Sequence, residues 1–356
     1  MTAAVPRAQA VGSLLRPERL KRARAAGLPP AELKRIEDAA VDEAIAVQRA
    51  AGLDEVTDGE MRRGHFTDAL ALAVDGLGDA PDTGPDGDPL HYTLGRVVTG
   101  RLRRRRSLAL EEFVYARARA GSVPVKQTLP SPLMMQAYWS PELSPAAYAD
   151  PFDMFADAAA VLREEIRDLA ALGCTSVQID APELALLVDP DVRAAFTRRG
   201  IDPRRMLTDG VDLIAGLTRV PGPRYALHLC RGNKEGRWRA SGGYDAVAAE
   251  VFRRAEGFGA FLLEYDDARS GGFGPLADVP DDRYVVLGLV STKRPELESE
   301  DELLRRVDEA ARYHPRARLA VSPQCGFAST LEGNPLTAAD QAAKLALVTR
   351  VARRAF

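Results

Sequence analysis

His228 and Cys230 are the two residues whose types and spacing point most directly to chemistry. They end a short apolar run, 224–230, that breaks at Gly232. Side chains two residues apart on a strand project from the same face, so an imidazole and a thiol would leave one strand together. One nitrogen donor and one sulfur donor on a shared face are half of a typical zinc site.

Two other strand ends offer further ligands. Cys325 follows a second short apolar run and precedes a glycine, and Glu264 ends a third. Taken singly, Cys325 is simply a small buried residue and Glu264 a solvated carboxylate. The chain has only three cysteines and four histidines, however, so their joint position at strand ends favours a shared role. We therefore predict one metal site built from His228, Cys230, Glu264 and Cys325.

Converging ligands require strands whose carboxyl ends meet at one place. Short apolar segments alternate with helical patterns along the chain, and this predicts a parallel sheet because parallel strands need a crossover. The expected strands are 9–13, 53–58, 123–129, 174–180, 224–230, 259–264, 284–290 and 318–323. The expected helices are 17–27, 30–51, 107–120, 151–173, 203–218, 244–257, 299–313 and 336–354.

Eight such units predict an α/β fold, a (β/α)8 TIM barrel whose active site lies at the carboxyl ends of the strands. A loop rich in Gly, Pro and Asp at 79–90 leads into an inserted hairpin near 91–106. We expect the whole chain, 1–356, to form one catalytic domain. A doubly wound open sheet is the alternative, but no Gly-x-Gly-x-x-Gly turn follows an early strand.

The overall composition limits the classes of partner. The net charge is −3, and the basic cluster at 101–106 is typical of a solvated face, so we expect no nucleic acid partner. No apolar run approaches the ~20 residues of a membrane span, so we expect no membrane partner. Three cysteines cannot pair completely, which agrees with a reducing, cytoplasmic location. The composition leaves open whether the chain forms a homo-oligomer.

A set of motifs between about residues 9 and 350 resembles the catalytic barrel of cobalamin-independent methionine synthase. The motifs are Val11-Gly12-Ser13-x-x-Arg16-Pro17, Thr57-Asp58-Gly59-Glu60, Gln178-Ile179-Asp180-x-Pro182, His228-x-Cys230, Glu264 and Ser322-Pro323-x-Cys325-Gly326. The larger synthases carry an additional amino-terminal barrel. This chain is similar to the short, single-barrel branch, which includes the epoxyalkane:coenzyme M transferases.

The resemblance implies a zinc ion held by His228, Cys230, Glu264 and Cys325. It also implies that Ser13 and Glu60 hold the amino-acid end of homocysteine and that Asp180 faces the same pocket. We expect Glu60 and Asp180 to be catalytic, by binding an ammonium group or moving a proton. Their simpler interpretation is as carboxylates that cap strand ends.

The segment after the seventh expected strand departs from the methionine synthases. Val290 stands where they present a proton-donor histidine. The phrases 230–233, 263–267 and 289–293 are closer to the coenzyme M transferases. The resemblance therefore implies a small-molecule thiol and an alkyl donor as substrates. The reaction is either methyl transfer to homocysteine or a related thiol, or epoxide opening by coenzyme M or a similar thiol.

The expected mechanism is activation of the thiol. A free thiol near pKa 8.5 is mostly protonated at neutral pH, and metal coordination deprotonates it. We hypothesise that Glu264 yields its place on the metal to the incoming sulfur, which then attacks the alkyl donor. Arg231, Lys293 or Arg294 could hold an anionic substrate tail, although each could instead be a solvent-facing loop cation.

Three alternatives use the same residues differently. A zinc-dependent hydrolase or lyase on the same barrel would activate water in place of a thiol. A metal-free decarboxylase would leave the cysteines unexplained. A closed zinc site would only stabilise the fold and would need no pocket lined by acids.

Overall fold

The central element of the computed structural model is a parallel sheet. The structure describes residues 5–64, 68–79, 95–233 and 235–356. Six strands are hydrogen-bonded in the order in which they occur in the chain. They are β3 (Gln127–Pro130), β4 (Ser176–Asp180), β5 (Arg224–Leu229), β6 (Ala260–Glu264), β7 (Tyr284–Val290) and β8 (Leu319–Pro323).

Two short extended segments close this sheet into a barrel. Ala8 pairs with Val321 on β8, Gln9 pairs with Glu55, and Val56 pairs with Val125 just before β3, all in parallel. The segments around residues 8–9 and 55–56 therefore occupy the first and second strand positions. The predicted (β/α)8 barrel is confirmed, and its eight strand positions match the predicted segments closely.

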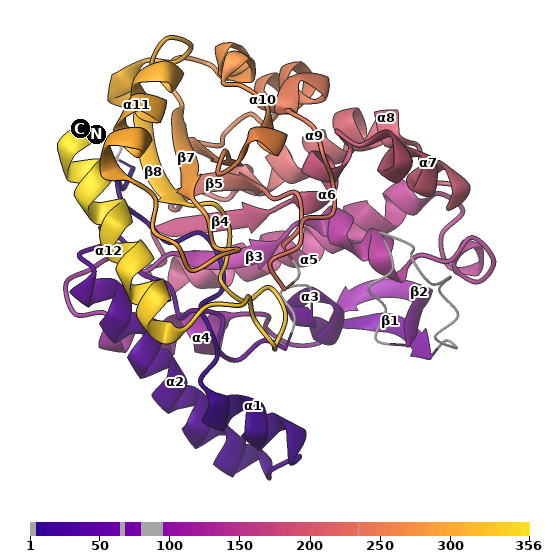
Figure 1. Ribbon diagram of the computed structural model, residues 1–356. Helices are drawn as coiled ribbons and strands as arrows, with labels where there is room; N and C mark the ends of the chain where they lie inside the picture. Colours follow the sequence, from indigo (N-terminus) through magenta and orange to yellow (C-terminus); the bar gives the residue numbers. More distant parts are fainter. Residues whose placement is uncertain (1–4, 65–67, 80–94, 234) are drawn as a thin grey trace.

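Helices surround the barrel (Figure 1). The longest are α2 (Pro30–Ala50), α5 (Pro151–Ala171) and α12 (Ala338–Ala355). The remaining α-helices are α1 (Glu18–Ala25), α3 (Asp68–Ala73), α4 (Leu110–Arg119), α6 (Pro182–Leu186), α7 (Pro190–Arg198), α8 (Pro203–Arg205), α9 (Val211–Ala215), α10 (Ala248–Arg254) and α11 (Glu300–Ala310). The two ends of the described chain meet, because the Arg7 guanidinium lies 4.9 Å from the ring centre of Phe356.

The inserted hairpin begins earlier in the chain than predicted. Its second strand, β2 (Arg96–Arg104), falls in the expected region, but its partner is β1 (Val74–Asp79). The prediction of a hairpin contained within 91–106 was therefore wrong about the partner strand. The predicted loop at 79–90 lies outside the described residues from residue 80 onward. β1 is rich in Gly and Asp, which hides its strand character because those residues disfavour strands.

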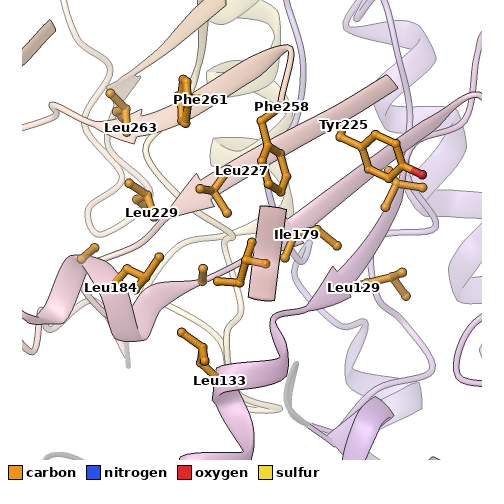
Figure 2. Packing of buried hydrophobic residues seen from close by; sticks show 14 of the residues in the cluster. Leu129, Leu133, Ile179, Leu184, Tyr225, Leu227, Leu229, Phe258, Phe261 and Leu263 are labelled. Carbon is orange, nitrogen blue, oxygen red and sulfur yellow. The ribbon is translucent and has the colours of Figure 1, made fainter. Parts of the chain in front are cut away.

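The two faces of the sheet carry different residues. Ile179, Leu227 and Phe261 face outward on adjacent strands, at matching positions in the register, and join the large core under the helices (Figure 2). A smaller cluster fills the barrel interior and consists of Val11, Ala260, Leu262, Val286 and Ala320. His228 and Glu264 are in phase with the interior positions, since strand side chains alternate.

In the part of the chain that the structure describes, none of the helices combines the length and apolar character that crossing a membrane would require.

Candidate metal centre

The structure brings the four predicted ligand side chains together at the carboxyl end of the barrel. His228 lies on β5 and Cys230 directly follows it, Glu264 is the last residue of β6, and Cys325 lies two residues beyond β8. One donor atom from each of the four lies within 4.8 Å of the others. The sulfur atoms of Cys230 and Cys325 are 3.3 Å apart.

The donor set fits a zinc ion. In a tetrahedral site with bonds of ~2.3 Å, two sulfur ligands lie ~3.8 Å apart, which is close to the separation found here. His228 Nε2 is buried and has no hydrogen-bond partner among the described residues. Two sulfurs, one imidazole and one carboxylate are a set that zinc accepts and that harder cations such as Mg²⁺ do not favour.

The electrostatics of the cluster favour negative charge on sulfur. The hydrogen bond from the Cys230 thiol, together with the nearby His228, lowers the pKa of Cys325 to about 7. Burial lowers the pKa of His228, but the bond to Asp180 and the neighbouring Cys325 outweigh burial and raise it to about 10. The hydrogen bond to Cys325 and burial instead raise the pKa of Cys230, so the negative charge is favoured on the sulfur of Cys325.

Asp180 positions the imidazole of His228. Its Oδ1 lies 2.8 Å from His228 Nδ1 and accepts a 2.6 Å hydrogen bond from Gln178 Nε2. Asp180 and His228 are register partners on β4 and β5. A carboxylate on one ring nitrogen fixes the tautomer and directs the other nitrogen at a metal. Here that other nitrogen is Nε2, which faces the cysteines.

Glu264 is held at both oxygens by groups of the chain. Oε1 accepts a 2.7 Å hydrogen bond from Gln324 Nε2, and Oε2 accepts a 3.1 Å bond from the Arg231 backbone N–H. Its own N–H donates to the Tyr244 hydroxyl at 2.9 Å. These contacts fix the carboxylate beside the sulfurs.

Of the three cations predicted to bind an anionic substrate tail, Arg231 and Lys293 are held by other groups of the chain, and Arg294 is exposed outside the described cavity lining. The fully buried Arg231 guanidinium donates to the carbonyls of Glu264 (2.6 Å) and Gly242, and lies 4.5 Å from the ring centre of Tyr244. Lys293 Nζ lies 2.7 Å from Asp266 and 2.9 Å from Asp267. Among the described residues, the lining of the cavity beside the metal centre includes neither Arg231 nor Lys293.

That cavity adjoins the metal centre and is lined by residues from several strand ends. Ser13, Glu60 and Asp180, which were predicted to meet the substrate, all line it with three of the four candidate ligands. Sequence reasoning missed four other polar lining residues, Asn233, Arg239, Ser329 and Thr330. They lie in loops outside the expected strands, where neither periodicity nor motif could find them.

Glu60 reaches the cavity through an uncommon backbone conformation. Its φ is +56°, directly after Gly59 at +68°, and its N–H donates to Asp58 Oδ1 at 2.9 Å. Non-glycine residues rarely adopt such angles, and those that do often lie at functional sites. The Glu60 carboxylate accepts a 3.1 Å bond from the Thr128 hydroxyl and lies 3.7 Å from the Arg63 guanidinium. Burial raises the pKa of Glu60.

Ser13 is held by the segment that follows Cys325. Its hydroxyl donates to the Ala328 carbonyl at 2.6 Å. A side chain at Gly326 would lie 2.7 Å from the Ser13 nitrogen. Glycine at 326 therefore lets this segment pack directly on the first strand position.

The chain is similar to known proteins. The chain matches a family model described as the catalytic domain of cobalamin-independent synthase, over residues 13–213 and 262–348. The uncharacterized protein YxjH of Bacillus subtilis is 37% identical over 97% of this chain and 93% of its own length. The methionine synthase of Sulfolobus acidocaldarius is 23% identical over 89% of this chain and 84% of its own length.

A solved structure has the same fold. The B12-independent methionine synthase from Shewanella sp. W3-18-1, in complex with selenomethionine, superposes with a TM-score of 0.78. The two chains are 19% identical, and the superposition covers 99% of this chain and 98% of that one.

Proposed function

This chain belongs to the family of the cobalamin-independent synthase catalytic domain, and from that premise we propose that it is a zinc-dependent S-alkyltransferase. It would move a methyl or other alkyl group from a donor to the sulfur of a small-molecule thiol. The observation that carries the proposal is the meeting of four donor atoms within 4.8 Å, beside a cavity that is lined by Glu60 and Asp180.

His228, Cys230, Glu264 and Cys325 would hold the zinc ion. When bound, zinc supplies positive charge that lowers the pKa of a coordinated thiol, so that the sulfur is nucleophilic at neutral pH. Asp180 orients His228 Nε2 toward the donor cluster, and Gln324 with the Arg231 backbone holds Glu264. These contacts are present in the chain itself, which therefore preorganises the ligands.

The cavity residues would bind the rest of the thiol. Glu60 and Asp180 line it as acids, suited to an ammonium group or to a proton transfer near the reacting sulfur. Burial raises the pKa of Glu60, the Arg63 guanidinium lowers it, and the negative charge of Asp180 raises it again by a smaller amount. An ammonium group between them would relieve that repulsion.

Val290 bears on the nature of the alkyl donor. It ends β7, is fully buried and packs in the outer hydrophobic core, so it cannot give a proton to a leaving group. Any proton that the leaving group takes up, such as the proton on the alkoxide of an opened epoxide, would therefore come from another group, and Glu60 and Asp180 are the acids that line the described cavity. Methyl transfer to homocysteine or a related thiol and epoxide opening by coenzyme M or a similar thiol are the two reactions to compare. A hydrolase or lyase is less well supported, because two thiolate ligands make zinc a weaker acid toward water.

The first test is metal content. We expect Cys230→Ser and Cys325→Ser to lose most of the zinc that the unaltered protein holds, measured by elemental analysis after gel filtration. Cys174→Ser is the matched control, because Cys174 is buried just before β4, at the end of the barrel away from the centre. Full zinc content in both altered proteins would remove the metal from the proposal.

The second test is the reaction. Zinc-loaded protein is incubated with homocysteine or 2-mercaptoethanesulfonate and with methyl iodide or 1,2-epoxypropane as simple donors. We expect thioether product, detected by mass spectrometry, at a rate well above that of the chelator-treated protein. Equal rates with and without zinc for every pair would contradict the proposed transferase.

A further inference from the structure

Arg239 stands out among the residues that line the cavity. Apart from the candidate ligand His228, it is the one basic side chain among the described lining residues, which also include the acids Glu60 and Asp180. Arg239 lies on the loop that connects β5 to α10, nine residues after Cys230. No motif in the sequence marks it.

The aliphatic part of Arg239 lies directly over the backbone next to Cys230. A Cβ atom at Gly232 would fall 2.6 Å from Arg239 Cγ and 2.7 Å from its Cβ. Gly232 has a φ of +86°, and its N–H donates to Cys230 Sγ at 3.2 Å. The absence of a side chain at 232 therefore lets Arg239 approach the metal centre.

The loop that carries Arg239 is held in place by several contacts. The N–H groups of Arg239 and Ala240 both donate to the Arg231 carbonyl, at 3.1 and 3.2 Å. Arg269 Nη1 donates to the Ala240 carbonyl at 3.0 Å, and its guanidinium lies 5.1 Å from the ring centre of Trp238. Arg239 is thus presented to the cavity by a folded loop.

The guanidinium of a residue that lines a cavity is suited to bind an oxyanion, because its N–H groups can donate two parallel, charge-assisted hydrogen bonds. We propose that Arg239 determines substrate specificity by binding a carboxylate or sulfonate group of a small-molecule substrate. This rests on the proposed function, since the substrate is the thiol or its alkyl donor. Arg231 and Lys293 do not fit this role, because neither belongs to the described lining of the cavity.

The placement also explains the charge pattern of the cavity. Glu60 and Asp180 offer negative charge to a cationic group, whereas Arg239 offers positive charge to an anionic one. A cavity with both signs discriminates charged substrates from neutral ones of the same size, because the neutral molecule gains none of the charge-assisted hydrogen bonds.

The test is a comparison of charged and neutral ligands by isothermal titration calorimetry on zinc-loaded protein. We expect Arg239→Gln to weaken binding of 2-mercaptoethanesulfonate by roughly tenfold to a hundredfold, while binding of 2-mercaptoethanol changes by less than about twofold. Arg239→Lys keeps the positive charge but not the planar guanidinium with its paired N–H donors. We therefore expect it to weaken binding of 2-mercaptoethanesulfonate less than Arg239→Gln does. Arg237→Gln is the control, because Arg237 is exposed on the same loop and does not line the cavity.

A second arm finds which substrate carries the anion. Rates are measured for glycidate and 1,2-epoxypropane, an anionic and a neutral epoxide, with 2-mercaptoethanol as the thiol. Loss of kcat/KM for glycidate alone assigns the anion to the donor, and weaker binding of the sulfonate thiol alone assigns it to the thiol. Unchanged values in both arms would overturn the role of Arg239.

Two further measurements separate this inference from the proposed function. Ethanesulfonate has no thiol, so its binding to the unaltered protein, and the loss of that binding in Arg239→Gln, reports on Arg239 even if no thiol reacts. If Arg239→Gln does not fold, the salt dependence of ligand binding to the unaltered protein tests the inference instead. Binding of 2-mercaptoethanesulfonate should weaken with ionic strength and that of 2-mercaptoethanol should not, and equal salt dependence would contradict the inference.

Discussion

At the scale of single residues, hydrogen bonds to the ligand side chains set the geometry of the candidate metal centre. Asp180 selects the ring nitrogen of His228 that faces the cysteines, and Gln324 holds Glu264. Such a partner can be replaced by a residue of the same size and shape, but the replacement changes the orientation and basicity of the ligand that it contacts. They are therefore the residues at which small substitutions should change metal affinity without changing the fold.

We expect Asp180→Asn to weaken zinc binding by roughly tenfold to a hundredfold, because an amide oxygen accepts the imidazole proton more weakly than a carboxylate does. Competition with a coloured chelator measures the affinity. Glu183→Gln is the control, since burial raises the pKa of Glu183 to about 8 and an amide resembles its acid form at neutral pH. Equal zinc affinities in all three proteins would mean that Asp180 does not position His228.

Strand alternation paired His228 with Cys230, and the positions of Glu264 and Cys325 at strand ends, together with the small number of cysteines and histidines, added the other two side chains that converge. It could not show that Asp180 contacts His228, because that contact depends on the register between β4 and β5. The sequence of a single strand does not show which of its residues lie opposite which residues of the neighbouring strand. The place of Arg239 in the cavity lining could not be predicted for another reason. It depends on the conformation of the folded loop and on the absence of a side chain at Gly232.

At the scale of elements, the turn at 58–61 shows how backbone conformation places a functional side chain. Gly59 and Glu60 both have positive φ, at +68° and +56°. A Cβ at Gly59 would lie 2.9 Å from the Cβ of Ala44 on α2. The turn is thus packed closely against α2.

This packing makes Gly59→Ala more damaging than an ordinary substitution of a left-handed glycine. Gly27 has φ +59°, and a Cβ added there would meet no atom within 4 Å, so Gly27→Ala should cost only about 1–2 kcal/mol for the left-handed conformation. Gly59→Ala adds the clash and should cost about 1–3 kcal/mol more. Urea unfolding measures both, and equal losses would show that the turn can relax away from α2.

Elements with strong periodicity were predicted well, whereas mixed segments were not. The expected helices at 30–51 and 151–173 match α2 and α5. The expected helix at 203–218 is helical throughout, although its hydrogen bonding changes from α8 to a π-helical stretch (Met206–Gly210), then to α9 and to a 3-10 stretch (Gly216–Arg219). α6 and α7 were missed, because both begin at prolines in a segment that follows β4 directly. Proline marks a first turn but does not by itself indicate the helix that follows.

At the scale of the whole molecule, the barrel has an outer hydrophobic core that does not include the candidate ligands. Removal of zinc should therefore leave the fold intact at room temperature and lower only its thermal stability. At zinc concentrations of about 100 times the dissociation constant, binding stabilises the native state by about 2.7 kcal/mol. For a chain of 356 residues, that corresponds to a fall in Tm of roughly 3–4 °C on chelation.

Differential scanning calorimetry with and without chelator measures this shift, and Cys325→Ser should show no further fall on chelation. Global unfolding of the unaltered protein by chelator at about 25 °C would instead indicate a structural zinc site. That outcome would favour a protein stabilised by metal over a catalyst.

The distance along the chain between Cys230 and Cys325 has a consequence for biosynthesis. The two sulfurs touch in space but are 95 residues apart, and Cys325 follows the last strand, β8. During translation the histidine, the first cysteine and the glutamate emerge long before their fourth partner. The four-residue cluster is therefore complete only after Cys325 has been synthesised and β8 has docked between β7 and the first strand position.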